Sequence, residues 1–252
     1  LKQVDATTPA FTVDPPADEP AADGLADGGI LRVVTGTFEV PNFLTGKGEP
    51  GSALNNGSGP DANPIPQQNG TFQAPFTCVI PRVALGDGDT TVPTAVALYG
   101  HGLLGSRDEV RGAAPDFAVE NAITFCATDW KGMSDEDVPN AAAILGDLSG
   151  FRTLADRLQQ GMLNFLVLGR LLKADDGLVS HEAFQDSAGN PLIATDGELL
   201  FVGNSQGGII GGALSAVAQD WTRVVLGVPG VAYHVLLNRS IDWDEFKVIY
   251  DA

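Results

Sequence analysis

Residues 199–212 read LLFVGNSQGGIIGG, and this stretch decides which fold the sequence predicts. Its first four residues form a short apolar run typical of a buried strand, and the small apolar residues after Gly208 are typical of a buried helix. Gly203, Ser205 and Gly207 between them have the G-x-S-x-G spacing of a sharp strand-to-helix turn that exposes a serine. Glycine is expected on both sides of Ser205, because a Cβ there would collide with the backbone.

This turn predicts a nucleophile. The backbone N–H of Gln206, at the start of a helix, points to where an oxyanion would form. We therefore expect Ser205 to attack an acyl carbonyl and the Gln206 N–H to stabilise the resulting charge. The alternative is a tight turn with a solvated serine, since the spacing also arises by chance in a chain with 31 glycines.

A second motif lies about 100 residues upstream, where residues 100–105 read GHGLLG directly after a short apolar run. A glycine-rich loop lets backbone N–H groups approach an oxyanion closely. We expect the Leu103 N–H to be the second donor, with Gly102 as its neighbour, and His101 to hold the loop by hydrogen bonding. Alternatively, His101 is a polar residue at the end of a strand.

Strands and helices alternate through most of the chain. Apolar runs predict strands at 30–40, 71–81, 94–99, 123–128, 199–202 and 223–227. Helical patterns cover 108–121, 147–173 and the residues after Ser205. This order predicts an α/β fold whose mostly parallel sheet has helices on both faces and an antiparallel N-terminal edge.

Two of the expected helices have defined faces. In the 108–121 helix, Phe117 is expected on the buried side with Val110, Ala114 and Ala118. The 147–173 helix has an apolar stripe that begins at Phe151, and its polar residues, Asp156 and Gln160 among them, are expected on the surface.

Composition excludes several classes of partner. The 252 residues carry 14 Lys and Arg against 32 Asp and Glu, a net charge of −18. Nucleic acids and anionic membrane surfaces bind basic patches, so neither is an expected partner. No apolar run reaches 18 residues, so no membrane span is expected. The three scattered histidines predict no metal site, and no cofactor is expected.

The two cysteines, Cys78 and Cys126, both lie in apolar, strand-like runs. If they pair, they close a loop of about 50 residues, worth roughly 4 kcal/mol by chain entropy. Such a disulfide would indicate an oxidising compartment. The alternative is two buried thiols.

The combined order of strand, GHGLLG loop, helix, strand, helix, strand, GNSQGG turn and helix resembles the α/β-hydrolase superfamily. Four shorter stretches resemble large secreted bacterial lipase/esterase-like proteins: FTCVIP at 76–81, LYGHGLLG at 98–105, DWKGMS at 129–134 and GVPG at 227–230. The resemblance runs from Ile30 to residue 252. It implies a secreted or periplasmic serine hydrolase that cleaves carboxylic esters of small molecules or lipids.

The expected organisation is an extended arm at 1–29 followed by an α/β-hydrolase catalytic domain at 30–252. Residues 231–252 are expected to begin a cap or a partner-contacting segment. The long loop at 41–69 is expected to border the mouth of the site, and residues 86–89 (GDGD) to form a turn.

The rest of a catalytic triad is harder to place. In the superfamily that the chain resembles, an acid and then a histidine follow the serine. His101 belongs to the glycine-rich loop, His181 precedes Ser205, and His234 closely follows the last expected strand. Asp242 and Asp244 are either the acid or the start of a cap. We therefore expect the sheet to lack its last strands, and a second chain or further C-terminal segment to supply Asp and His.

Two other functions remain open on this sequence. A peptidase or an acyltransferase would use the same nucleophile on the same fold. A non-catalytic binding or structural module would keep the fold without a working triad.

Overall fold

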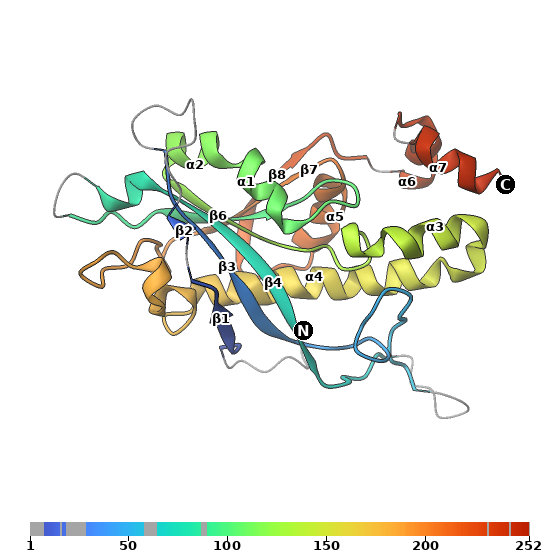
Figure 1. Ribbon diagram of the computed structural model, residues 1–252, viewed down its shortest axis with the longest axis horizontal. Coiled ribbons are helices and arrows are strands. Elements are labelled where there is room, and N and C mark those ends of the chain that lie inside the picture. The colour runs from blue at the N-terminus through green and yellow to red at the C-terminus, as the bar shows by residue number, and fades with distance from the viewer. Residues whose placement is uncertain are drawn as a thin grey trace.

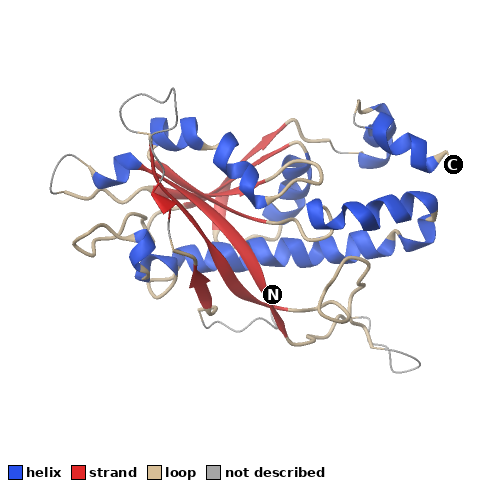
Figure 2. Ribbon diagram, viewed as in Figure 1, coloured by secondary structure: helices blue, strands red, loops and turns tan. Residues whose placement is uncertain are grey.

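A computed structural model describes residues 8–15, 17–18, 29–57, 65–86, 90–230, 232–241 and 243–251. Its centre is a single twisted sheet (Figures 1 and 2). The strands are β1 (Phe11–Val13), β2 (Ala17–Asp18), β3 (Ile30–Pro41), β4 (Thr71–Pro81), β5 (Ala95–Gly100), β6 (Ile123–Thr128), β7 (Leu199–Asn204) and β8 (Trp221–Gly227).

The order of the strands is β1-β3-β4-β6-β5-β7-β8, with β2 also paired to β3. β6, β5, β7 and β8 are parallel to one another, whereas β4 is antiparallel to both β3 and β6. The predicted sheet, parallel at its centre with an antiparallel N-terminal edge, is confirmed. Because β5 lies between β6 and β7, the chain reverses direction along the sheet there, and the loops after β5 and β7 meet.

Helices cover both faces of this sheet. Helices α1 (Val110–Ala113) and α2 (Pro115–Asn121) lie on one face, and α4 (Arg152–Lys173) and α5 (Gln206–Ser215) on the other. The remaining helices, α3 (Val138–Gly146), α6 (Tyr233–Leu236) and α7 (Trp243–Tyr250), lie together beyond one end of the sheet (Figure 1). Successive residues of β5 point to opposite faces of the sheet, and each face has its own hydrophobic core. Leu98 packs with α4 and α5 on one face, whereas Ala97 packs with α1 and α2 on the other.

The two cysteines form a disulfide. Cys78 of β4 and Cys126 of β6 are direct partners in the antiparallel ladder, with Cα atoms 4.1 Å apart. Both are fully buried. The bond therefore ties the antiparallel edge of the sheet to its parallel centre.

Both long helices differ from their predicted form. The 108–121 helix is two helices, with Pro115 at the start of the second, and Phe117 is 64% exposed rather than buried. The other three apolar residues, Val110, Ala114 and Ala118, are spaced four apart and face the sheet. α4 begins at Arg152, because Asp147 accepts the Ser149 N–H (3.0 Å) and a separate short turn precedes the helix.

The polar residues of α4 were predicted on the surface, and for two of them this was wrong. Asp156 and Gln160 are buried. Asp156 accepts the Leu54 N–H and Gln160 the Phe43 N–H, both at 2.9 Å. These side chains satisfy the backbone of the long 42–57 loop, which therefore lies along α4.

Some sequence-based expectations fall partly outside the described residues. Residues 87–89 of the expected GDGD turn and Asp242 are not described. Of the expected N-terminal arm, the described β1 and β2 are extended and pair with β3. None of the described helices is both long and apolar enough for a membrane crossing.

We predict that the double variant Cys78→Ala/Cys126→Ala loses about 4 kcal/mol of unfolding free energy, because the unfolded chain regains the entropy of a closed loop. Urea unfolding would measure the loss. Reducing agent should destabilise the wild type to the same extent and leave the double variant unchanged. A wild type insensitive to reduction would contradict the prediction.

Candidate active site

Ser205 lies between β7 and α5, at the carboxyl end of a central parallel strand. Its backbone has φ 53° and ψ −118°, a left-handed conformation that non-glycine residues rarely adopt. The side chain is exposed, and within the described residues its hydroxyl makes no hydrogen bond. The turn is tied to the neighbouring strand, since the Ser205 N–H donates to the carbonyl of Gly227 at the end of β8 (3.0 Å).

The two glycines beside Ser205 allow a very close approach of backbones. A Cβ on Gly203 would lie 2.2 Å from the Gly207 carbonyl oxygen, and one on Gly207 would lie 2.0 Å from that of Gly100. Neither position can hold a larger residue without moving the strand or the helix. The start of α5 is thereby held against the end of β5, where the GHGLLG loop begins.

Hydrogen bonding within that loop leaves one central N–H group free. The Gly102 N–H donates to Oε2 of Glu109 (2.9 Å), and the Leu104 N–H points at Oε1 of Gln206 (3.4 Å). Among the described residues, the Leu103 N–H has no acceptor. Gly102, expected as a neighbouring donor, has its N–H committed to Glu109 in this conformation.

The side chain of Gln206 joins three segments around Ser205. Its Nε2 donates to the carbonyls of Gly102 (3.1 Å) and Met133 (2.9 Å), while Oε1 faces the Leu104 N–H. The residue is 3% exposed. Its own backbone N–H is the first of α5, so no acceptor exists for it within the helix. Gln206 thus combines a free backbone donor with a side chain that holds the opposite loop.

His101 is fully buried and uses both ring nitrogens. Nε2 accepts the Trp130 N–H and Nδ1 lies against the Gly102 carbonyl, both at 2.9 Å. This pattern requires the neutral ring with its proton on Nδ1. Burial lowers the pKa of His101, outweighing the Gly102 carbonyl and the nearby carboxylates of Asp129 and Glu109.

The other two histidines do not complete a triad within the described side chains. The His181 ring lies 6.3 Å from that of Phe11 in β1, at the opposite edge of the sheet from β7 and Ser205. His234 lies in α6, and its side chain is not among the described ones. Asp244, at the start of α7, is exposed.

A buried ion pair that was not predicted from the sequence supports the site. Asp137 accepts the N–H groups of Gly132 (2.7 Å) and Ser134 (3.2 Å), and pairs with Arg157 of α4 at 2.7 Å. Asp137 and Arg157 are both fully buried. The pair fixes the loop after β6, which contributes the Met133 carbonyl. Ser134 and Asp137 form a capping box, so their S-x-x-D spacing was the available signal.

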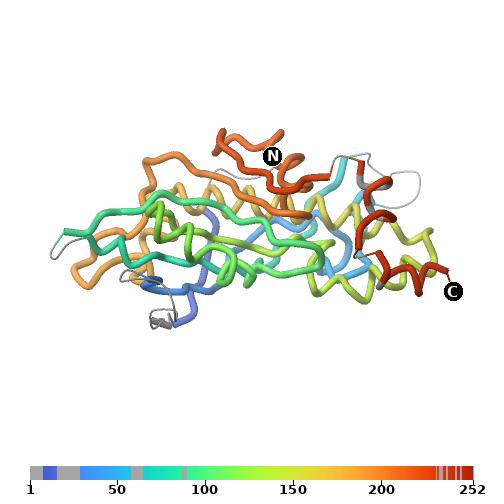
Figure 3. Tube along the Cα trace, turned by 90° about the horizontal axis from the view of Figure 1, so that it is seen from above, coloured from blue at the N-terminus to red at the C-terminus, as the bar shows by residue number. Residues whose placement is uncertain are grey.

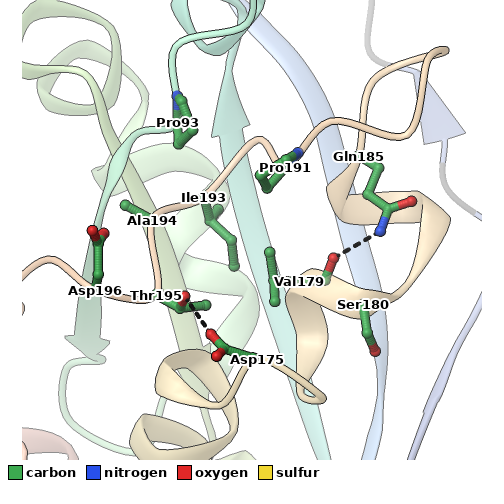
Figure 4. A pocket seen from close by; sticks show the side chains of 10 residues that line it. All are labelled: Pro93, Asp175, Val179, Ser180, Gln185, Pro191, Ile193, Ala194, Thr195 and Asp196. Carbon is green, nitrogen blue, oxygen red and sulfur yellow. Dashed lines mark hydrogen bonds between the residues drawn. The ribbon is translucent and has the colours of Figure 1, made fainter.

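Two cavities differ in their relation to Ser205. An apolar pocket of about 410 Å³ is lined by Leu103, Gln206 and Ile209, together with residues of α3, α4 and α7. A more open hollow of about 580 Å³ lies at the amino end of β5, around Asp175 and Thr195 (Figure 4). Ligands of parallel sheets bind at the carboxyl ends of strands, so the smaller pocket is the candidate substrate site.

Two further expectations concern the surroundings of the site. None of the described residues of the 42–57 loop lines the pocket beside Ser205, so the structure gives no support to that loop as its border. The described residues contain no group of three or more His, Cys, Asp or Glu side chains that could hold a metal ion.

The strand order, the antiparallel β4 and the serine turn after β7 define an α/β-hydrolase fold. No protein-family model matches the sequence, and no curated protein does. Among solved structures, acetyl xylan esterase 1 from Thermoanaerobacterium sp. JW/SL YS485 is similar, with 13% identity over 99% of this chain and 62% of that one (TM-score 0.46).

Two further solved structures are similar. A putative acetyl xylan esterase from Bacteroides fragilis NCTC 9343 has 13% identity over 86% of this chain and 47% of its own (TM-score 0.46). A cold-adapted esterase from an Arctic intertidal metagenomic library has 13% identity over 85% and 67% (TM-score 0.41). The chain thus spans 62% and 47% of the lengths of the two acetyl xylan esterases.

We predict that His101 makes stability fall with decreasing pH. Because its pKa is lowered in the folded state, the unfolded chain binds this proton first as the pH drops below about 6.5. The loss should reach about 1.4 kcal/mol per pH unit down to the folded-state pKa. In His101→Asn this contribution disappears, so urea unfolding between about pH 5 and pH 7 should show a shallower dependence. Parallel profiles for the two proteins would contradict the prediction.

Proposed function

We propose that this chain is a carboxylic ester hydrolase whose nucleophile is Ser205. The observation that carries the proposal is the conformation of Ser205. A positive φ on a serine raises the free energy of the folded state, and such strain is concentrated at functional sites. Ser205 has this conformation between a central strand and a helix, and its exposed hydroxyl makes no hydrogen bond within the described residues. The N–H groups of Gln206 and Leu103, which have no acceptor among the described residues, belong to the start of α5 and to the loop after β5.

The reaction follows from these groups. The Ser205 oxygen attacks the ester carbonyl carbon while a base removes the hydroxyl proton, and the carbonyl oxygen becomes an oxyanion. The N–H groups of Gln206 and Leu103 donate to that oxyanion. The bond to the alcohol oxygen then breaks as the alcohol takes the proton. Water attacks the acyl-enzyme, which releases the acid and restores Ser205.

The base and the acid that orients it are proposed to be a histidine and an aspartate outside the described side chains. His101 is excluded because both of its ring nitrogens are engaged, and His181 because it lies at the opposite edge of the sheet. Residues 231–252 would cap the site, which is supported by the position of α7 at the pocket. The disulfide fits folding in an oxidising, extracytoplasmic compartment.

We predict that a fluorophosphonate forms one covalent adduct, on Ser205, because the probe reacts with activated serines and leaves a phosphonyl group in place of the acyl group. Mass spectrometry of the digested protein would locate it. Ser205→Ala should take up no probe. Ser187→Ala, which alters an exposed serine in the 185–191 connection, should be labelled as the wild type is.

We predict that Gln206→Glu slows this labelling at least tenfold, because a carboxylate would face the carbonyls of Gly102 and Met133 and displace the loop that carries Leu103. Gln160→Glu is the matched control. Gln160 is equally buried and also bridges two backbone groups, but those belong to residues 41 and 43.

Both Gln→Glu variants should lose about 1–3 kcal/mol of unfolding free energy per carbonyl left unpaired. Only Gln206→Glu should react slowly with the probe. Equal labelling rates in the two variants would contradict a role for the Gln206 side chain in positioning the loop.

A non-catalytic α/β-hydrolase-fold module is the second candidate function. The observation in its favour is that the described histidine side chains are both engaged away from Ser205. Absence of fluorophosphonate labelling in the full assembly, with every histidine far from Ser205, would support the module and reject ester hydrolysis. A peptidase or an acyltransferase on the same fold would be labelled as an esterase is, and turnover of ester, peptide and acyl-acceptor substrates would separate them.

A further inference from the structure

The apolar pocket begins at the same residues that carry the proposed oxyanion donors. Leu103, Gln206 and Ile209 line it. Ile209 lies one helical turn after Ser205, and its N–H donates to the Ser205 carbonyl (3.0 Å). An ester carbonyl held between the Leu103 and Gln206 N–H groups would therefore lie at one end of the pocket. The group attached to that carbonyl would extend along it.

Two antiparallel helices, α3 and α4, form two further walls. α3 contributes Ala141 and Ile144, and the first turns of α4 contribute Leu154 and Leu158. Phe151, the first residue of the predicted apolar stripe, is 57% exposed and lines the pocket. This end of α4 and α3 lie together at one end of the molecule (Figure 1).

The third wall is α7. Trp243, Phe246 and Tyr250 are spaced three and four residues apart, so they occupy one face of this helix, and all three line the pocket. The Trp243 and Tyr250 rings lie 5.6 Å apart. Figure 3 shows α7 at the same end of the molecule as α3 and the start of α4.

The lining restricts the chemistry of the ligand. Among the described residues that line the pocket, none carries a charge. Their polar side-chain groups are the Gln206 amide, which already has hydrogen-bond partners within the protein, and the Trp243 indole N–H and Tyr250 hydroxyl on α7. A charged group entering this space would lose its hydration without an opposite charge to compensate. An aliphatic chain gains instead, by about fourfold in affinity for each methylene removed from water.

We propose that this pocket binds the acyl chain of the ester, and that the acyl group is a long aliphatic chain rather than acetate. The volume of about 410 Å³ lies within the usual range for small-molecule sites. This inference rests on the proposed ester hydrolysis at Ser205. It assigns the acyl side of the substrate, because the pocket is continuous with the residues that would hold the carbonyl.

Esters that share the p-nitrophenyl leaving group and differ in acyl length test this assignment. We expect kcat/KM to rise from acetate through butyrate to octanoate, by as much as about fourfold per methylene. A flat profile or a preference for acetate would overturn it. A matched series of acetate esters with alcohols of increasing length should show no such rise, and a rise confined to that series would assign the pocket to the alcohol instead.

Filling the pocket should abolish the preference for long chains. Ala141→Phe adds a ring to the pocket wall, whereas Ala143→Phe adds the same ring at an exposed position of α3 outside the pocket. We expect Ala141→Phe to lower the ratio of kcat/KM for octanoate to kcat/KM for acetate at least tenfold, and Ala143→Phe to keep the wild-type ratio. Equal ratios in the two variants would overturn the proposal.

Binding of decanoate separates failure of this inference from failure of the proposed function. Trp130 and Trp221 are buried in the core, so a decanoate-induced change in tryptophan emission should come from Trp243 and vanish in Trp243→Phe. Acetate should cause no change. Decanoate binding without fluorophosphonate labelling of Ser205 would reject ester hydrolysis but keep the aliphatic ligand. Labelling without decanoate binding, or with equal responses to decanoate and acetate, would reject the aliphatic pocket and keep the hydrolase.

Discussion

The contact between the start of α5 and the end of β5 constrains everything around Ser205. Gly207 lies so close to the Gly100 carbonyl that a Cβ would be 2.0 Å from it, and Gly203 is similarly close to Gly207. The chain can pass from β7 into α5 at this separation only by turning sharply at Ser205, which takes the positive φ. The first N–H of the helix is thereby brought beside the loop after β5. The strained serine and the proposed oxyanion donors are consequences of one steric condition.

Side chains that bond to irregular backbone hold the loops around this contact. Gln206 and Glu109 bind the backbone of the GHGLLG loop, and Asp137 binds that of the loop after β6. Buried ions are unfavourable unless they are paired and fully hydrogen-bonded. Asp137 meets this condition through Arg157, whose guanidinium also donates to Glu136 and to the Gly48 carbonyl. These residues therefore keep three loops in fixed positions, which a preorganised oxyanion site requires.

The pocket has a simpler origin, which is the unequal length of neighbouring elements. α4 has 22 residues and so extends about 33 Å, whereas the central strands of six residues extend about 20 Å. The helix must continue past the sheet, and its apolar stripe continues with it. Phe151 and Leu154 consequently line the pocket beside Ser205, and Leu158 both lines it and packs against the core.

The sequence by itself determined the elements that local pattern controls. The bounds of β4 and β6, the turn at Ser205 and the mixed sheet followed from apolar runs and from glycines whose spacing has a steric cause. Pairing of the cysteines was one of two alternatives, and only the register of β4 against β6 decided it. Helix faces were less predictable, since Phe117 fits an apolar stripe yet lies outward once Pro115 divides the helix.

Only the tertiary structure decided the roles of the polar residues. Asp156, Gln160 and Arg157 have the spacing of a solvated helix face, but they are buried because the distant 42–57 loop lies over them. Likewise, the sequence predicted Leu103 as the second donor with Gly102 as its neighbour, but only the structure shows which of the two N–H groups is engaged. The choice depends on Glu109, which takes the Gly102 N–H. A residue's hydrophobicity predicts whether it is buried, whereas the partner of a polar group is supplied by whatever segment the fold brings to it.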